Sequence, residues 1–291
     1  MNMTMNKLSS LRSLIARAVV AATLVTAAGG LAVAAEEGGH GSPKPPREHW
    51  SFAGPFGRFD QAQLQRGFQV FKEVCASCHG AHLLAFRNLA QPGGPGFTDA
   101  QARVVAEGFQ IQDGPNDAGD MFDRPGRLSD RWPSPFPNEQ AARASNGGAY
   151  PPDFSTLAKA RTYEVGFPGF LIDIFTQYQE QGPDYIHALL NGYTNPPEGF
   201  NLPEGAHYNA YFPGHAIKMP QPISEGQVTY SDGSPETVEQ YSHDVTAFMM
   251  WVAEPHLEAR KRLGFQVMIF LIVFAGLLYF TKKKVWKSVE H

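Results

Sequence analysis

The sequence predicts a mainly α-helical protein with long loops and one transmembrane helix near its C-terminus. Two segments, 61–74 and 235–253, carry apolar residues at helical spacing, and an almost uninterrupted apolar run follows at 264–280. The chain also holds 29 glycines and 23 prolines among its 291 residues, which indicates many loops but falls short of a disordered composition. With 43% hydrophobic residues, a chain of this length can bury a sizeable core.

The first 35 residues have the features of a secretory signal peptide. Three basic residues precede an apolar run from Ala18 to Val33, and this run ends in small residues just before Glu36. Small residues at that place match a signal-peptidase cleavage site. An uncleaved N-terminal anchor is the alternative interpretation. We predict that residues 1–35 direct export and are removed.

The cysteines, Cys75 and Cys78, are the only two in the chain and carry the first chemical signal. With His79 they form the pattern C-x-x-C-H, the attachment signature of c-type haem, in which both thiols add to porphyrin vinyl groups and the histidine ligates the iron. A thioredoxin-like redox pair is the alternative, but it requires a βαβ pattern that the sequence does not show. Half of a zinc site is another, but no second ligand pair follows at zinc spacing. Export favours the haem, and we predict one haem c, bound covalently.

Two helices are expected to frame this motif. Asp60 is suited to cap a helix over 61–74, which leads directly into the motif. A second helix is predicted over 235–253, with Ser234 as its cap and Pro235 in its first turn.

The apolar stripes of these two helices suggest that they cross. Haem proteins with this motif often let a glycine of the N-terminal helix meet an aromatic residue of the C-terminal one. Gly67 and Phe71 would then face Tyr241 and Phe248. Ordinary core packing explains each of these residues equally well when taken singly.

A second axial ligand decides what the haem does, because a His–Met pair fills both faces of the iron and favours electron transfer. Met219 lies in a loop with Pro220 and Pro222, where proline limits the alternatives open to the backbone. The competing residues are Met121, Met249, Met250, Met268, His82, His187, His207, His215 and His243. The proline-restricted loop favours Met219 as the ligand but does not exclude the other residues.

The apolar run at 264–280 predicts a membrane-spanning helix. At 1.5 Å per residue it reaches roughly 26 Å, close to the thickness of the hydrocarbon core. Seven basic residues flank it: Arg260, Lys261 and Arg262 before it, and Lys282, Lys283, Lys284 and Lys287 after it. A buried core helix would not be bracketed in this way. The flanking charge barely decides the orientation, whereas the predicted signal peptide does decide it. We expect an exported domain at 36–259, an anchor at 260–281 and a cytoplasmic tail at 282–291.

The exported domain is strongly acidic once the two ends are set aside. Of the 24 basic residues, three lie in the predicted signal peptide and seven from residue 260 onward, so 14 remain at 36–259 against 27 acidic ones. This balance makes nucleic acid a poor partner. It suits a basic protein partner, whose encounter would be accelerated by the complementary charge. Solubility alone is the alternative explanation.

Longer motifs then reveal a family resemblance that covers most of residues 59–284. They are Cys75 to His82, Arg124 to Asp130, Pro137 to Ala144, Gly148 to Asp153, Asn209 to Gly214, Ala216 to Met219, Trp251 to Pro255 and Arg260 to Gly264. In these motifs the sequence resembles cytochrome c1, the haem subunit of the quinol–cytochrome c reductase (bc1) complex. The resemblance implies a class I c-type cytochrome fold with long loop insertions.

The resemblance also implies roles for single residues. Cys75 and Cys78 would form the thioether links, with His79 and Met219 as the axial ligands of the iron. Arg124 stands where the family has an arginine that pairs with a haem propionate, for which a planar guanidinium is well suited. Tyr211 and Phe212 would line the haem environment. A solvated loop arginine and ordinary core aromatics are the alternatives for these last three residues.

The function implied by the resemblance is electron transfer without catalysis by this chain alone. Electrons would pass from the Rieske iron–sulfur protein to a soluble cytochrome c, beside cytochrome b in a bacterial inner membrane, with the haem domain on the periplasmic side. One alternative is a membrane-tethered cytochrome that feeds a terminal oxidase or photosynthetic centre. Another is a haem enzyme or gas sensor with an open sixth position.

One segment departs from the shorter mitochondrial pattern. Residues 162–181 are rich in aromatic side chains and resemble an insertion, too short and too polar to span a membrane. We expect this segment to pack on the domain or to contact a neighbouring subunit. Because the chain has no cysteine outside the haem motif, packing alone must stabilise it.

Overall fold

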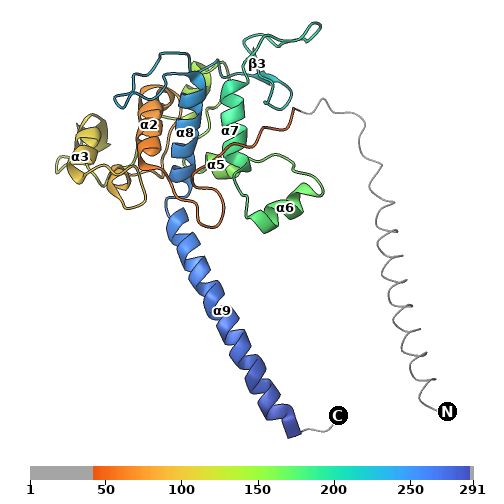
Figure 1. Ribbon diagram of the computed structural model, residues 1–291. Coiled ribbons are helices and arrows are strands. Elements are labelled where there is room, and N and C mark those ends of the chain that lie inside the picture. Colours follow the sequence, from red (N-terminus) through yellow and green to blue (C-terminus); the bar gives the residue numbers. More distant parts are fainter. Residues whose placement is uncertain (1–41, 289–291) are drawn as a thin grey trace. The chain divides into compact units, whose positions relative to one another are not determined.

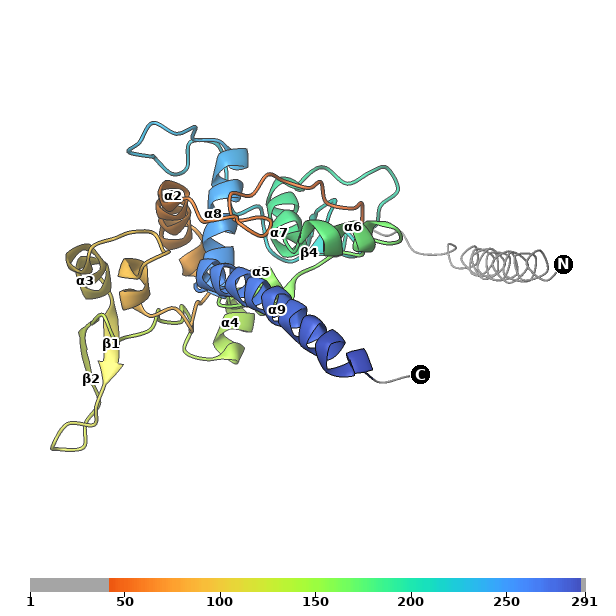
Figure 2. The same cartoon turned by 60° about the horizontal axis from the view of Figure 1, so that its bottom comes forward.

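A computed structural model describes residues 42–288 (Figure 1). Its helices are α2 (Gln61–Glu73), α3 (Asp99–Glu107), α4 (Glu139–Ser145), α5 (Leu157–Ala160), α6 (Gly169–Thr176), α7 (Gln181–Asn191), α8 (Val238–Ala253) and α9 (Leu257–Val285), with short 3-10 turns η1 (Cys75–Ser77), η2 (Phe86–Ala90) and η3 (Trp286–Ser288). Two small antiparallel ladders pair β1 (Gln110–Asp113) with β2 (Phe122–Pro125) and β3 (His207–Tyr208) with β4 (Ala216–Ile217). The β1–β2 hairpin projects from the helical body (Figure 2). The predicted signal peptide lies outside the described residues, as do residues 289–291 of the predicted tail.

Helix α8 forms the centre of the domain, between α2 and α7 (Figure 1). The cap at the start of α2 is the predicted one, since Asp60 Oδ1 accepts hydrogen bonds from the backbone N–H groups of Ala62 and Gln63. At the crossing with α8, a Cβ built on Gly67 would lie 2.1 Å from the carbonyl oxygen of Asp244. Only glycine therefore allows the two helices to approach this closely. The predicted crossing of the two helices is confirmed.

The aromatic partners at the crossing are only partly those predicted. The rings of Phe71 and Phe248 lie 5.4 Å apart, and Phe248 Cβ is also among the atoms nearest to Gly67. Tyr241 is instead engaged with the loop before α8, where its hydroxyl donates to the carbonyl of Val228 and its ring contacts Tyr230. Its polar tip explains the difference, because a buried hydroxyl requires a hydrogen-bond partner.

The predicted start of the second helix is wrong by three residues. Helix α8 begins at Val238, and its cap is Thr237, whose hydroxyl accepts from the backbone N–H of Gln240. Upstream, the backbone N–H of Ser234 donates to Asp232, and the Glu236 carbonyl accepts from Gly226. These turn contacts keep Ser234 and its neighbours out of the helix.

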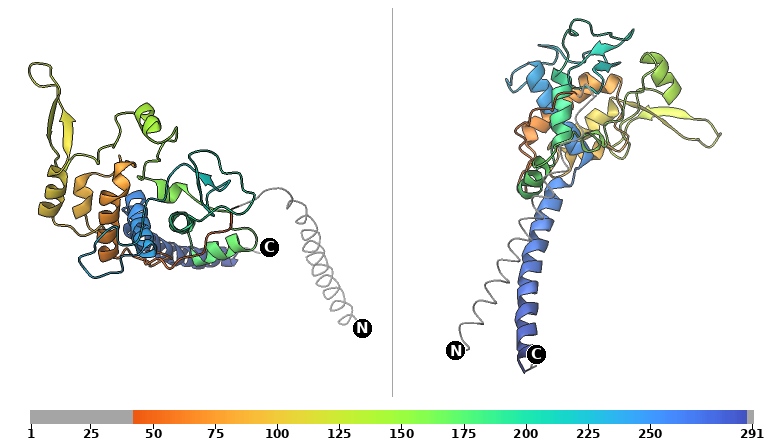
Figure 3. Two further views of the ribbon diagram at one scale, coloured as in Figure 1. Left: turned by 90° about the horizontal axis from the view of Figure 1, so that it is seen from above. Right: turned by 90° about the vertical axis from the view of Figure 1, so that its right-hand side faces the viewer.

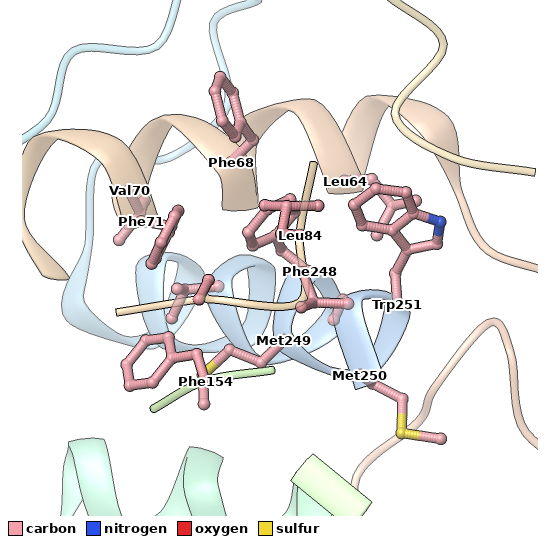
Figure 4. Close-up of a cluster of buried hydrophobic side chains, with 14 of the residues drawn as sticks. Leu64, Phe68, Val70, Phe71, Leu84, Phe154, Phe248, Met249, Met250 and Trp251 are labelled. Atoms are coloured by element: carbon pink, nitrogen blue, oxygen red, sulfur yellow. The ribbon is translucent and has the colours of Figure 1, made fainter. Parts of the chain in front are cut away.

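The core between these helices is built from large apolar side chains (Figure 4). The rings of Phe68 and Phe71 both contact that of Trp132, at 5.9 and 5.0 Å, and Phe248 contacts Trp251 at 5.6 Å. Met249 and Met250, two of the competing ligand candidates, are buried in the core, where methionine packs as an apolar side chain. The core thus buries the apolar face of α2, the helix that ends just before the C-x-x-C-H motif.

Among residues 42–288, one helix is long and apolar enough to cross a membrane. This is α9 with its terminal turn, Leu257–Ser288, and no part of its apolar window is buried in the protein. It fits the predicted single-pass anchor, although the helix extends beyond the predicted 260–281 at both ends.

The junction between α8 and α9 is short and braced. Only residues 254–256 separate the two helices. Lys159 Nζ donates to Glu254 Oε2 at 2.6 Å, and the Arg260 guanidinium donates to the same carboxylate. Burial by itself would raise the pKa of Glu254, but the hydrogen bonds from Arg260 and Lys159 outweigh it and hold the pKa below its ordinary value of 4.5.

Replacing Glu254 by glutamine is expected to destabilise the domain at neutral pH by about 1–2 kcal/mol, because two charge-assisted hydrogen bonds are weakened. A lowered folded-state pKa means that this stabilisation is present above the ordinary pKa of 4.5 and is lost as the pH falls through the folded-state pKa. The difference between wild type and E254Q should therefore vanish in acid. Urea unfolding between about pH 3 and 7 measures it. The exposed Glu139→Gln is the control, and a pH-independent difference would contradict the assignment.

Candidate functional site

The C-x-x-C-H residues lie on one tight turn at the end of α2. Residues Cys75–Ser77 form η1, and the backbone N–H groups of Cys78 and His79 both donate to the carbonyl of Cys75, at 3.1 and 2.9 Å. Both cysteines are half-buried and form no disulfide. Burial raises the pKa of the Cys75 thiol to about 12, so the free side chain stays protonated. The turn brings two thiols and one imidazole together, as attachment of a c-type haem requires.

His79 is oriented by a backbone carbonyl. Its Nδ1 lies 2.8 Å from the oxygen of Pro152. A carbonyl only accepts, so Nδ1 must carry the proton, and the lone pair of Nε2 stays available for a metal. Burial lowers the pKa of His79, which favours the neutral imidazole that ligates iron. The donor set therefore fits the proximal side of a haem.

The segment that supplies this carbonyl is tied to the chain just after the motif. The backbone N–H of Phe154 donates to the carbonyl of Gly80 at 2.8 Å, and the Phe154 ring contacts the His79 ring at 4.5 Å. The Asp153 carboxylate accepts from the backbone N–H groups of His82 and Ser155, at 3.0 and 2.8 Å. Burial alone would raise the pKa of Asp153, but hydrogen bonds from Ser155 and His82 lower it. Asp153 thus acts as a positioning residue for the carbonyl that holds His79.

Replacing Asp153 by alanine is expected to destabilise the folded protein by about 1–3 kcal/mol, because two backbone N–H groups lose their acceptor. The 151–155 segment would then hold the His79 ring less firmly. Thermal unfolding followed by far-UV circular dichroism measures the loss. Asp123→Ala, at an exposed position of β2, is the matched control, and equal effects of the two variants would contradict this role.

Met219 follows the β3–β4 ladder and is held through its backbone. The Tyr193 hydroxyl donates to the Met219 carbonyl at 3.1 Å, and Tyr193 itself forms a bridge with Asn209. Met219 is only partly buried, and Pro220 follows it directly. The loop is thus fastened to the chain just beyond α7, which limits the positions its thioether can take. Its role as a ligand remains a prediction.

Tyr211 and Phe212 lie in the turn between β3 and β4, organised by a residue that sequence reasoning missed. Asn209 is fully buried, and its Oδ1 accepts from the backbone N–H groups of Tyr211 and Phe212, at 3.0 and 3.2 Å. Its Nδ2 donates to the carbonyl of Leu189 at 2.7 Å. A Cβ at Gly192 would lie 2.8 Å from Tyr211 Cδ2, so the tyrosine ring packs directly on that glycine. An asparagine before an aromatic pair and Pro-Gly was the available signal, since Asn side chains organise turns.

Arg124 lies on β2, where its guanidinium is engaged by two carboxylates. It donates to both oxygens of Asp130, at 2.6 and 3.0 Å, and to Asp113 on β1. These hydrogen bonds raise the pKa of Arg124 and lower those of Asp113 and Asp130. The bonds fix the β1–β2 hairpin to the loop after it. A contact with a haem propionate remains a prediction for this residue.

Two of the competing histidines are used in packing. His243 stacks on Trp50 at 4.5 Å between ring centroids, and the buried His187 meets the edge of Trp50. The two ring nitrogens of His187 face different carboxylates: Nδ1 lies 3.8 Å from Glu48, and Nε2 lies 3.2 Å from Glu239. The ring is thus flanked by two carboxylates, and Glu48, His187 and Glu239 each offer one possible ligand atom within 4.8 Å of the others.

Comparison with known proteins gives a consistent result. The family model described as the Cytochrome C1 family matches residues 50–289. A protein of Bradyrhizobium diazoefficiens named cytochrome b/c1 is 68% identical over 84% of this chain, which spans only 36% of that longer relative. Cytochrome c1 of Blastochloris viridis is 53% identical over 86% of this chain and 89% of its own length, and that of Rhodospirillum rubrum is 44% identical over 96% and 99%.

The match extends to mitochondrial proteins. A potato relative named as a mitochondrial cytochrome c1 heme protein is 44% identical over 83% of this chain and 84% of its own length. The helix crossing, the oriented histidine and the single apolar C-terminal helix agree with these matches. The chain belongs to the cytochrome c1 family.

Proposed function

We propose that the chain binds one haem c covalently, through thioether bonds to Cys75 and Cys78, with His79 and Met219 as the axial ligands. The observation that carries this proposal is the hydrogen bond from His79 Nδ1 to the Pro152 carbonyl, because it selects the tautomer whose Nε2 ligates iron. A haem held in this way supplies reversible one-electron transfer at its iron. Arg124, Tyr211 and Phe212 are proposed to contact the propionates or the surrounding pocket.

The covalent link is tested by extraction. After extraction with acidified acetone, the haem should remain on the wild-type chain. The Cys75→Ala/Cys78→Ala variant should carry no haem after the same extraction. The pyridine haemochrome spectrum of the wild-type chain should be that of a haem whose two vinyl groups have been saturated. Haem extracted completely from the wild-type chain would contradict covalent attachment.

The proposed role is electron transfer from the Rieske iron–sulfur protein to a soluble cytochrome c, within the quinol–cytochrome c reductase complex. The family membership supports it, and so does the relative named cytochrome b/c1, which suggests cytochrome b as the neighbouring subunit. An acidic domain of 14 basic and 27 acidic residues at 36–259 favours a basic soluble carrier as acceptor.

The proposed location is a bacterial inner membrane, with the haem domain on the periplasmic side and the basic tail inside. The predicted signal peptide supports this orientation, because an exported domain leaves the tail after α9 inside. Attachment of haem c outside the cytoplasm requires the same orientation.

The short junction before α9 argues against a freely tethered carrier, the second candidate function. A carrier that shuttles between partners needs a long flexible linker. Here residues 254–256 are the only link between α8 and α9, and Glu254 is bonded to Lys159 and Arg260 on its two sides. The braced geometry favours a fixed place beside other membrane subunits.

The function is tested on native membranes that carry the chain with an affinity tag after His291. After mild solubilisation and capture, we expect cytochrome b and an iron–sulfur protein in the eluate. Quinol-driven reduction of added cytochrome c should be blocked by inhibitors of the reductase. A haem-containing eluate without partners or activity would overturn the proposal in favour of a tethered carrier.

A further inference from the structure

Helix α6, in the segment 162–181, has an outward apolar surface. Phe175 is 86% exposed and Phe167 is 80% exposed. The other exposed apolar side chains of this surface are Phe170, Leu171, Ile172 and Ile174. We call these six residues the α6 apolar surface. Soluble proteins rarely leave so many large apolar side chains together in water, and such patches mark interaction sites.

The polarity of α6 is inverted relative to that of a helix on a water-exposed surface. Its one charged residue, Asp173, is buried against the protein, where it pairs with Arg47 at 2.5 Å and accepts from Gln181 at 3.2 Å. A surface helix of a soluble domain buries its apolar face and exposes its charges. In α6 the charge faces the domain and the apolar residues face away from it.

Both ends of the segment are fixed to a buried carboxylate, so the exposure of α6 is built into the fold. The hydroxyls of Tyr163 and Tyr178, on either side of α6, donate to Asp184 Oδ2 at 3.0 and 2.7 Å. Asp184 is fully buried, and its other oxygen accepts from Trp50 Nε1 at 2.8 Å. Arg47 also lies over the ring of Tyr178. These contacts hold α6 with its apolar surface outward.

The segment lies beside the start of the membrane-spanning helix. A small cavity is lined jointly by Gln177 and Glu180, just after α6, and by Arg260 and Lys261, in the first turns of α9. Two views agree that α6 lies at the end of the helical body from which α9 departs (Figures 1 and 3). The apolar part of α9 begins only two residues after Lys261, so α6 is placed near the level at which α9 enters the bilayer.

A second apolar feature occurs at the same end of the domain. Phe56, in the loop before α2, is 71% exposed, and its ring contacts that of Phe265 on α9 at 5.4 Å. Pro55, its neighbour, lines the cavity that Gln177 and Glu180 also line. Phe56 therefore contacts the first apolar turn of α9, at the same end of the domain as the segment that carries the α6 apolar surface.

We propose that the α6 apolar surface lies in the interfacial layer of the lipid bilayer that α9 crosses, so that the segment 162–181 is a second membrane contact of the domain. Interfacial helices bury apolar side chains at the boundary of headgroups and acyl chains. Arg262, an exposed residue next to Lys261 in the same turn of α9, is placed to meet lipid phosphates. The bilayer is favoured over a protein partner because a membrane-spanning α9 places this end of the domain at the bilayer surface, whether or not another protein is present.

The test uses the full-length holoprotein in vesicles of equal parts phosphatidylcholine and phosphatidylglycerol, oriented with the haem domain outside. Because the thiols of the two native cysteines are proposed to form thioether bonds to the haem, a single added cysteine is the only thiol left to react with a label. Phe175→Cys reports on α6, Val104→Cys on the exposed surface of α3, and Phe274→Cys on α9. A charged, membrane-impermeant maleimide measures accessibility, and phosphatidylcholine with a diazirine in its acyl chain marks peptides that touch lipid.

We expect the cysteine at 175 to react at least about tenfold more slowly than that at 104, and the 167–176 peptide to carry photo-crosslinked lipid. Reaction at 175 as fast as at 104, without lipid crosslinks, overturns the proposal. Protection at 175 without lipid crosslinks also overturns it and points to a second copy of the chain. If position 175 becomes protected only when the full complex is assembled, a neighbouring subunit covers α6 and the proposal is again overturned.

The inference rests on α9 spanning the membrane. The cysteine at 274 tests that span separately from the membrane contact of α6. A protected, lipid-crosslinked position 274 together with an accessible position 175 would disprove the role of α6 and leave the anchor intact. An accessible position 274 would disprove the anchor itself. The haem absorption spectrum of each variant confirms that the domain is folded, and all three substitutions replace exposed side chains.

Discussion

Replacing Met219 by leucine is expected to lower the reduction potential of the haem by on the order of 100 mV or more, since a thioether ligand raises the potential and leucine cannot ligate. At about 59 mV per tenfold for one electron, such a change shifts the equilibrium with a redox partner by roughly 50-fold. Quinol-driven cytochrome c reduction would slow accordingly. Potentiometric titration of the haem absorbance measures the effect directly.

The control for this prediction is Met121→Leu, at an exposed position near the β1–β2 turn, which should leave the potential unchanged. An M219L variant with the spectrum and potential of the wild type would place the sixth ligand elsewhere. In that case the open-site enzyme or gas sensor, or a histidine ligand, becomes the better interpretation. Tyr193→Phe adds a graded test, because it removes the hydroxyl that holds the Met219 backbone while leaving the thioether in place.

Replacing Gly67 by alanine is expected to destabilise the domain by about 3 kcal/mol or more, the upper range for overpacking. The new Cβ would lie 2.1 Å from the Asp244 carbonyl oxygen and 2.7 Å from Phe248 Cβ. The oxygen belongs to the backbone of α8, so the clash is relieved only if the two helices separate. The better helix propensity of alanine, worth about 1 kcal/mol, does not offset this.

Thermal unfolding of the solubilised protein measures the loss, with Gly276→Ala as the matched control, because a Cβ there meets nothing within 4 Å. The G67A protein should also retain less haem, since α2 leads directly into the C-x-x-C-H turn. An equal stability of the two glycine variants would show that the crossing is looser than the structure indicates.

Local patterns in the sequence determined much of what was predicted correctly. The Asp60 cap, the helix before the C-x-x-C-H motif and the apolar C-terminal helix depend on residues within a few positions of one another. Short-range hydrogen bonds and helical periodicity are therefore readable from the chain alone. The family was likewise readable from the sequence, because its motifs are long and follow one another in a fixed order.

Other features depend on residues that are distant in the chain. The Pro152 carbonyl that orients His79 lies 73 residues further along the chain. The start of α8 at Val238 depends on hydrogen bonds in the preceding loop, which the apolar periodicity of the helix does not reveal. Tyr241 lay on the predicted apolar stripe, yet its hydroxyl draws it to Val228. The sequence pattern alone does not predict which distant acceptor a buried hydrogen-bond donor will contact.

The segment 162–181 shows the limit most clearly. Its composition indicated an aromatic-rich insertion that packs on the domain or contacts a neighbouring subunit. Only the tertiary structure decided that Asp173 turns inward to Arg47 while Phe175 and its apolar neighbours turn out. The sequence determined the fold class, the C-x-x-C-H turn and the apolar C-terminal helix through local propensity and spacing. Tertiary contacts decided the orientation of the histidine and of α6, because a side chain's direction depends on partners brought close only by folding.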